Sequence, residues 1–238
     1  SNFGYKKVTP KEKTKLVQKV FSNVANKYDL MNDIMSFGAH RFWKKKFIDI
    51  VNPSQNDRII DVGSGSGDLV IEIQKKKFKG KIDIVDLNKE MLNEGKKRIK
   101  QKNINFYLQN AENLSFANNI YDKYLISFCL RNITNIDKSL EEAFRIIKPG
   151  GQYYCLEFSK PNSIFISNIY SYYKSNLIPF FGKVFSNNQK AYSYLNESID
   201  MFPNQQNLKK RMEKAGFKSV KFLNLFDGIV SIHTGFKY

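Results

Sequence analysis

Residues that build disulfide frameworks and metal sites are scarce in this chain. Its 238 residues include two cysteines, two histidines and one tryptophan. Two cysteines are too few for a disulfide framework or for a zinc site of the CxxC type. His40 and His233 lie far apart in the sequence and do not suggest a metal cluster. We therefore expect no metal, and we expect Cys129 and Cys155 to be buried thiols in a reducing cytoplasm.

Long apolar runs are also missing. No segment approaches the roughly 18–20 uninterrupted apolar residues that a membrane span needs. The first ten residues, SNFGYKKVTP, contain no apolar stretch of the kind found in a secretory signal. We therefore expect a cytoplasmic protein, and any contact with a membrane would be peripheral.

Acidic residues are few compared with basic ones. The 22 Asp and Glu residues stand against 39 Lys and Arg residues, which gives a net charge of +17. A basic excess of this size favours anionic partners, either nucleic acid or an anionic membrane surface. Only six of the basic residues are arginines, whereas proteins that read nucleic acid rely on the planar fork of Arg. We therefore expect no nucleic acid partner.

Between residues 53 and 160, short apolar runs alternate with longer polar stretches. Strand–helix–strand repetition of this kind predicts an α/β fold, in which a parallel sheet carries helices on both faces. Near the C-terminus, Asp227-Gly228 between two alternating runs predicts an antiparallel hairpin. The expected strands are 58–62, 81–86, 104–109, 124–130, 152–158, 219–226 and 229–238, and the expected helices are 12–27, 40–51, 68–77, 88–101, 137–147 and 207–217.

A glycine-rich loop, DVGSGSGD, follows the first of these strands at 61–68. Its glycines let the backbone turn sharply and approach a ligand closely, although a bare glycine loop is also compatible with a flexible turn. A dinucleotide fingerprint would need a glycine where Asp68 stands, and a carboxylate opposes a pyrophosphate at a helix N-terminus. A ligand with a sulfonium and an ammonium tolerates the carboxylates. The loop therefore favours S-adenosylmethionine over NAD, with Asp61, Gly63, Gly65, Ser66 and Gly67 as cofactor-binding candidates.

Polar residues also follow the next three strands. Asp86 ends the second strand, 19 residues beyond Gly67, where a carboxylate can accept hydrogen bonds from both hydroxyls of a ribose. A solvated Asp at a strand end is the alternative. The residues after the third strand sit where an adenine would lie, and the fourth strand ends beside the crevice. These positions add Asp86, Leu87, Asn110, Ala111 and Ser127 to the candidates.

Taken in order, the motifs resemble those of the ubiquinone/menaquinone biosynthesis C-methyltransferases (UbiE type), which are class I S-adenosylmethionine-dependent methyltransferases. The resemblance runs from about residue 14 to the C-terminus. The glycine loop is common to the whole class, whereas YDLMND at 28–33, FCLRN at 128–132 and LEFSKP at 156–161 are far more specific. The chain departs from the family pattern at Ser66, where Thr is usual, and at Cys129, where Gly is common.

This resemblance implies a Rossmann-like fold, with a mostly parallel seven-stranded sheet and an antiparallel C-terminal hairpin. It implies methylation of a ring carbon of a polyprenylated benzoquinol (2-polyprenyl-6-methoxy-1,4-benzoquinol type), of demethylmenaquinol, or of both. It also carries cofactor contacts onto Ser66, Asp86, Asn110, Ala111 and Ser127. Two alternatives stay open: a methyltransferase acting on RNA or another small molecule, and a non-catalytic subunit of a quinone-synthesis assembly.

On the acceptor side, the candidates are residues that could activate a ring hydroxyl. Arg131 would stabilise a developing phenolate, unless it forms a salt bridge to a nearby acid, and Asn132 would orient the hydroxyl. Tyr28 could close the acceptor pocket or donate to the ring oxygen. His40 could act as base, although a structural histidine is an equal alternative. Glu157 is a further candidate base, and the alternative is a carboxylate that only balances the charge of the sulfonium.

We expect a single methyltransferase domain over residues 1–238. It would comprise an N-terminal helical cap (1–52), a cofactor-binding core (53–160), an aromatic-rich acceptor cap (161–205) and a C-terminal helix with a hairpin (206–238). Within the acceptor cap, the segment 167–185 could be core, a groove for the isoprenoid tail, or a face that docks on the inner membrane surface. The expected partners also include a second copy of the chain, in a homodimer, or the other proteins of a quinone-biosynthesis complex.

Overall fold

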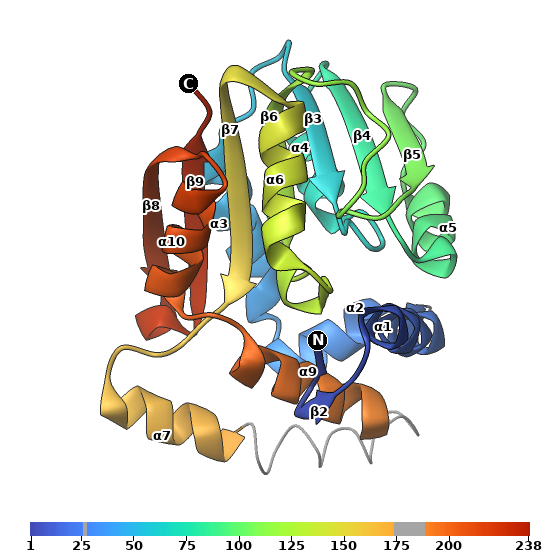
Figure 1. Cartoon of the computed structure of the whole chain (residues 1–238). Helices are drawn as coiled ribbons and strands as arrows, with labels where there is room; N and C mark the ends of the chain where they lie inside the picture. Colours follow the sequence, from blue (N-terminus) through green and yellow to red (C-terminus); the bar gives the residue numbers. More distant parts are fainter. Residues whose placement is uncertain (26–27, 174–188) are drawn as a thin grey trace.

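The computed structural model describes residues 1–25, 28–173 and 189–238 (Figure 1). Its centre is a seven-stranded sheet with the strand order β5-β4-β3-β6-β7-β9-β8. The five strands β3 to β7 run parallel to one another, whereas β9 runs antiparallel to both β7 and β8. This arrangement confirms the predicted fold. The strands are β3 (Arg58–Val62), β4 (Lys81–Asp86), β5 (Ile104–Leu108), β6 (Tyr121–Ser127), β7 (Ile147–Phe158), β8 (Lys218–Leu225) and β9 (Val230–Phe236).

Helices cover both faces of the sheet. Successive side chains of each central strand point to opposite faces, and apolar residues on both faces are buried under these helices. In β3, Ile59 packs with α3 (Ala39–Val51) and α4 (Asp68–Lys75), whereas Ile60 packs with α6 (Ile136–Ile146) and α10 (Gln205–Lys214). Both isoleucines are fully buried. Helix α5 (Lys89–Arg98) packs beside β4 and β5 at one end of the sheet.

A further set of helices lies across the carboxyl ends of the strands, at the bottom of Figure 1. They are α1 (Pro10–Val24), α2 (Tyr28–Ser36), α7 (Ile164–Tyr172) and α9 (Gln189–Met201). Helix α1 begins with a capping box between Thr9 and Glu12. Before it, a small hairpin of β1 (Asn2–Phe3) and β2 (Lys6–Lys7) lies against α9. The sequence did not predict α2 or this hairpin.

The predicted strand at 124–130 is too long at its carboxyl end. Strand β6 ends at Ser127, because Phe128 adopts a left-handed backbone with φ of 52° and turns the chain out of the sheet. A short 3-10 helix, η2 (Leu130–Asn132), follows at once. The turn places Arg131 and Asn132 beyond the carboxyl end of β6 rather than within the sheet.

The structure describes residues 167–173 of the predicted aromatic segment 167–185, and residues 167–172 belong to α7. Residues 174–185 lie outside the described residues. No helix in the described part of the chain is both long and apolar enough to cross a bilayer.

Candidate active site

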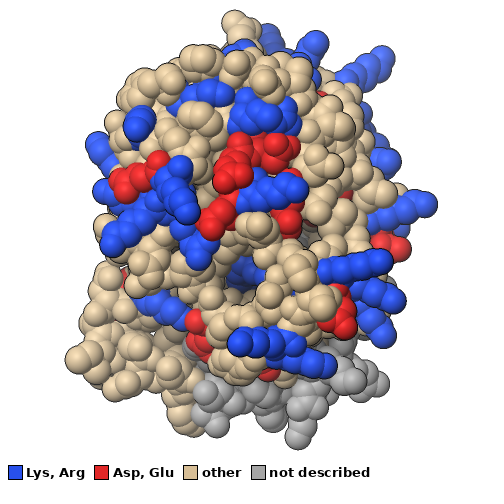
Figure 2. All heavy atoms as spheres, viewed as in Figure 1, with Lys and Arg blue, Asp and Glu red and all other residues tan. Residues whose placement is uncertain are grey.

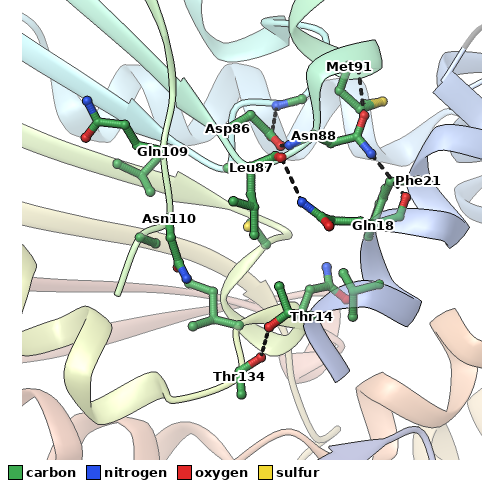
Figure 3. A pocket seen from close by; sticks show the side chains of 18 of the residues that line it. Thr14, Gln18, Phe21, Asp86, Leu87, Asn88, Met91, Gln109, Asn110 and Thr134 are labelled. Atoms are coloured by element: carbon green, nitrogen blue, oxygen red, sulfur yellow. Dashed lines mark hydrogen bonds between the residues drawn. The ribbon is translucent and has the colours of Figure 1, made fainter. Parts of the chain in front are cut away.

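A cavity opens between the carboxyl edge of the sheet and helix α1, and we call it the main cavity (Figure 3). Its walls come from the loop after β3, the turns after β4 and β5, the turn after β6, and one face of α1. The ends of neighbouring parallel strands meet at this edge, where open α/β sheets bind their ligands. The predicted site residues that line it are Gly63, Gly65, Asp86, Leu87, Asn110, Ala111 and Asn132.

Asp86 is fixed to the backbone on both sides of its carboxylate. Its Oδ2 accepts a hydrogen bond from the N–H of Gly65 at 2.8 Å, and its Oδ1 accepts one from the N–H of Asn88 at 2.8 Å. Burial raises the pKa of this carboxyl, and hydrogen bonds from backbone N–H groups oppose the shift. A carboxylate held in this way presents its remaining lone pairs to the cavity.

Gly63 occupies a position that no other residue fits. Its φ is +65°, and a Cβ there would lie 2.0 Å from the Sγ of Cys129. Both residues line the main cavity. Burial raises the pKa of the Cys129 thiol, so it is packed against the loop as a neutral group.

Helix α1 is tied over the main cavity by polar side chains that the sequence analysis did not single out. The Nε2 of Gln18 donates to the carbonyl of Leu87 at 3.0 Å, and the hydroxyls of Thr14 and Thr134 lie 2.9 Å apart (Figure 3). The Nδ2 of Asn88 donates to the backbone carbonyl of Gln18 at 3.1 Å. The sequence feature that could have pointed to these residues is the spacing of Thr14 and Gln18, which puts both on one face of the predicted helix.

A second, smaller cavity lies on the other side of the glycine loop, between Asp61, Ser127 and Lys44. Asp61 is 1% exposed, and burial raises its pKa to about 7. The hydroxyl of Ser64 donates to its Oδ2 at 2.5 Å. Within the described residues, Asp61 Oδ1 and Ser127 Oγ are buried without a hydrogen-bond partner. Buried polar atoms are normally paired, so these two atoms mark a place for a polar ligand.

Ser66 and Gly67 line neither of these cavities. The hydroxyl of Ser66 accepts a hydrogen bond from Arg98 Nη1 at 2.8 Å. The assignment of Ser66 and Gly67 to the cofactor stays a prediction. Asp68 is paired with Lys44 at 2.5 Å and with Arg98 at 2.8 Å. These partners offset its charge, so the argument against a pyrophosphate rests on Asp61 rather than on Asp68.

Arg131 and Glu157 form a buried ion pair, which is the alternative that the sequence left open for the arginine. Arg131 Nη1 lies 2.7 Å from Glu157 Oε1, and it also donates to the carbonyl of Phe128 at 2.6 Å. Burial raises the pKa of Glu157, and the guanidinium opposes that rise. Arg131 lines a third cavity, between the N-terminal hairpin and α9. Asn132, the next residue, lines the main cavity.

In the described part of the chain, the walls of these cavities do not include His40. His40 is 4% exposed, and its Nε2 lies 2.8 Å from Asp33 Oδ1. Burial lowers the pKa of this histidine, which favours the neutral ring of a structural residue. Tyr28 begins α2, and its side chain is outside what the structure describes. Their catalytic roles stay predictions. Among the described residues there is no group of three or more His, Cys, Asp and Glu side chains that could hold a metal.

Comparison with known proteins decides the family. The model of the ubiE/COQ5 methyltransferase family matches residues 7–237. The chain belongs to this family. Among curated relatives, proteins called ubiquinone/menaquinone biosynthesis C-methyltransferase UbiE match this methyltransferase over their length. Those of Rickettsia bellii and Rickettsia prowazekii are 45% and 44% identical over 245 residues, covering 100% of this chain and 98% of each relative.

Solved structures similar to this methyltransferase share its fold. A SAM-dependent methyltransferase from Thermotoga maritima has a TM-score of 0.67 at 19% identity, over 93% of this chain and 100% of that one. A SAM-dependent methyltransferase from Aquifex aeolicus has a TM-score of 0.59 at 16% identity, over 98% and 100%. Haemonchus contortus phosphoethanolamine N-methyltransferase 2, in complex with S-adenosyl-L-methionine, has a TM-score of 0.61 at 15% identity, over 82% and 52%.

Proposed function

We infer that this protein is an S-adenosylmethionine-dependent C-methyltransferase of ubiquinone/menaquinone biosynthesis, acting on a ring carbon of a polyprenylated quinol. Curated relatives with that name are 44–45% identical over the full chain. The observation in the structure that supports it best is Asp86, held by the glycine loop at the wall of the main cavity. We propose as acceptor a polyprenylated benzoquinol, demethylmenaquinol, or both.

The residues present fit the methyl donor, which supplies an electrophilic methyl group on a sulfonium. We propose that Asp86 binds the ribose hydroxyls and that Asn110 and Ala111 lie against the adenine. The second cavity would take the amino-acid end, because Asp61 Oδ1 and Ser127 Oγ are buried there without a partner among the described residues. An ammonium donates hydrogen bonds to both atoms and favours the ionised form of Asp61.

For the acceptor, we propose that Asn132 contacts the ring hydroxyl and that Arg131 stabilises the negative charge that develops on it. A ring carbon becomes nucleophilic as the hydroxyl loses its proton, so a fixed positive charge nearby lowers the barrier. Glu157 holds the guanidinium in place. We propose further that the caps at 1–52 and 161–205 cover the core of a single domain and keep water from this site.

The reaction is tested with purified protein, labelled S-adenosylmethionine and short-chain demethylated quinols, with product analysis by mass spectrometry. One arm contains the benzoquinol, one the naphthoquinol, and one total RNA. We expect a methyl group on a ring carbon of at least one quinol and none on RNA. Methylation of RNA alone, or binding of the donor without transfer to either quinol, would contradict the proposal.

The role of Arg131 is tested with a double variant and a single variant. Arg131→Ala alone would leave Glu157 unpaired, and removing one partner of a buried ion pair destabilises a protein by about 3–5 kcal/mol. Arg131→Ala combined with Glu157→Gln removes both charges together. We expect this double variant to fold, to bind S-adenosylhomocysteine as the parent does, and to lose turnover. Turnover equal to that of Glu157→Gln alone would assign Arg131 to structure only.

We also propose that the protein contacts a bilayer peripherally, through an exposed apolar face of six residues. Along this face the ring centroids of Phe37, in the turn before α3, and Tyr173, directly after α7, lie 5.6 Å apart. Those of Phe42 in α3 and Phe226 in the short 3-10 helix η4 (Phe226–Gly228) lie 6.1 Å apart. Helix α7 contains no charged residue, and the surface where it lies is almost entirely tan at the lower left of Figure 2. Lys45 and Lys46 are exposed one turn along α3 from Phe42. The face comprises Phe37, Phe42, Ile164, Phe165, Tyr172 and Phe226, which are 55–81% exposed.

Vesicle flotation tests this face with the full chain. We expect binding to vesicles that contain anionic lipid, and we expect Ile164→Asn with Phe165→Ser to abolish it. Leu108→Asn is the matched control, because Leu108 is 55% exposed at the end of β5 and is not part of the face. Equal flotation of the double variant contradicts the proposal. A dimer that dissociates on the same substitutions would assign the face to a second copy instead.

A further inference from the structure

Tyr194 connects the N-terminal hairpin to Asn132. It lies on α9, is 3% exposed, and donates a hydrogen bond from its hydroxyl to Asn132 Oδ1 at 2.9 Å. The ring of Phe3, in β1, stacks on the ring of Tyr194, with centroids 4.2 Å apart and planes 12° apart. Three residues from separate parts of the chain therefore form one series of contacts that ends at the wall of the main cavity.

The hairpin is itself anchored on α9. The N–H of Tyr5 donates to Glu197 Oε2 at 3.1 Å, and the hydroxyl of Tyr5 donates to Asp200 Oδ2 at 2.7 Å. Glu197 lies almost one turn beyond Tyr194 on the same helix, so these bonds and the stacking of Phe3 act on one side of α9. The position of Phe3 over Tyr194 is therefore fixed by more than the stacking contact.

The bond from Tyr194 decides which end of the Asn132 amide a ligand meets. A carboxamide has an acceptor oxygen and an NH2 group with two donor hydrogens. Asn132 Oδ1 accepts the hydrogen bond from the Tyr194 hydroxyl. Asn132 Nδ2 lies 3.4 Å from the carbonyl oxygen of Phe128, which is a long distance for a hydrogen bond. The group left for the acceptor is thus the donor, and a donor stabilises a phenolate more than a phenol. Burial raises the pKa of Tyr194, so its hydroxyl keeps the proton that it donates.

We propose that Tyr194 is a positioning residue for methyl transfer, which holds the Asn132 amide with Nδ2 available to the acceptor hydroxyl, and that Phe3 holds Tyr194. This inference rests on the role of Asn132 under the proposed function. Without Tyr194, the amide is free to turn its oxygen toward the ring hydroxyl, where an acceptor favours the protonated form.

The main test is Tyr194→Phe, which removes one hydroxyl and keeps the ring on which Phe3 stacks. We expect kcat with a short-chain demethylated quinol to fall about 10- to 100-fold, the range for leaving a buried acceptor unpaired. The pH at half-maximal kcat should rise, because the phenolate loses a donor. Affinity for S-adenosylhomocysteine, measured by calorimetry, should not change. In an Asn132→Ala background, Tyr194→Phe should have no further effect, since the partner is gone.

The matched control is Tyr154→Phe. Tyr154 is also 3% exposed, and its hydroxyl donates to Gln152 Oε1 at 2.5 Å on β7. We expect this variant to keep the kcat and the pH profile of the parent. If Tyr194→Phe does not fold, Phe3→Leu takes its place, with a smaller shift of the pH profile in the same direction.

The outcomes separate this inference from the proposed function. Parent-like kcat and pH profile in Tyr194→Phe, or in Phe3→Leu where that variant is used, overturn the inference while Asn132→Ala still loses turnover. A full additional loss in the Asn132→Ala background overturns it too, because Tyr194 would then act independently. If Asn132→Ala itself turns over normally, the proposed role of Asn132 fails, and the inference fails with it.

Discussion

The backbone N–H of Gly65 donates a hydrogen bond to Asp86 Oδ2 over 2.8 Å, which joins the glycine loop to the end of the neighbouring strand. Val62 pairs with Val85 at the carboxyl end of these two strands, so the loop and the carboxylate leave the sheet side by side. The geometry of the carboxylate that we propose to bind the ribose is therefore set before a ligand arrives, which lowers the entropy lost on binding.

We predict that Asp86→Asn weakens binding of S-adenosylhomocysteine roughly 10- to 100-fold. Hydrogen bonds to a charged group contribute about 1.5–3 kcal/mol each, and the substitution removes the charge while keeping the shape. Calorimetry with the purified protein measures the affinity directly. Asp49→Asn is the control, because Asp49 is exposed and paired with Lys76 on the helical surface. Equal affinities for the parent and Asp86→Asn would remove this carboxylate from the donor site.

Gly63 and Cys129 give a prediction about stability. We expect Gly63→Ala to lower the free energy of unfolding by about 2–5 kcal/mol, since a left-handed alanine costs about 1–2 kcal/mol and overpacking costs about 1–3 kcal/mol. The added Cβ would meet Cys129 Sγ. Urea denaturation of Gly63→Ala, Cys129→Gly and the double variant separates the two costs. Relative to Cys129→Gly, the double variant should lose only the backbone part, and a loss as large as that of Gly63→Ala alone would show that the thiol is not the obstacle.

The sequence predicted those parts of the site that local patterns determine. The apolar period of the strands, the glycine loop and the strand end at Asp86 are each encoded within a few residues, so the main cavity could be placed on the correct edge of the sheet. The end of β6 was misplaced by a few residues, because the apolar run continues to Leu130 while Phe128 already turns away. Periodicity carries no information about a single left-handed residue.

Contacts between distant segments could not be predicted in the same way. Gln18 binds the carbonyl of Leu87, 69 residues away, and Thr14 meets Thr134, 120 residues away. Such pairs depend on where α1 lies on the finished core. The partner of Arg131 was foreseen only as some nearby acid, and the fold identifies it as Glu157 because β7 pairs with β6 in register.

His233 should make the protein less stable in acid. Burial lowers its pKa to about 4, and its Nε2 lies 2.9 Å from the carbonyl of Gln205. Between about pH 6.5 and pH 4 the unfolded chain binds a proton that the folded chain does not. This group therefore removes about 1.4 kcal/mol of stability for each unit that the pH falls in that window. The measurement is urea denaturation of the parent and His233→Gln at pH 5, 6 and 7, where the advantage of the parent should shrink toward pH 5. A constant difference would contradict the lowered pKa.

Asp61 should couple donor binding to pH. Burial raises its pKa to about 7, so below that pH the folded protein carries a neutral Asp61 while the unfolded chain carries an ionised one. The sign is opposite to that of His233, because here stability falls as pH rises from about 4 to 7. In the proposed mode of binding, the ammonium of the donor lies beside Asp61 and favours its ionised form. Binding of S-adenosylhomocysteine below pH 7 should therefore release a proton and weaken by up to about tenfold per unit of falling pH.

The proton release gives the sharper measurement. Calorimetric titrations at pH 6 in two buffers with different ionisation enthalpies should differ by the heat of close to one proton taken up by the buffer. Asp61→Asn cannot release that proton, so its binding heat should be the same in both buffers and its affinity nearly constant from pH 5.5 to 7.5. A parent protein that shows equal heats in the two buffers would mean that Asp61 is already ionised in the free protein. The second cavity would then owe its affinity to a preformed charge, and the burial of Asp61 Oδ1 would have no consequence for binding.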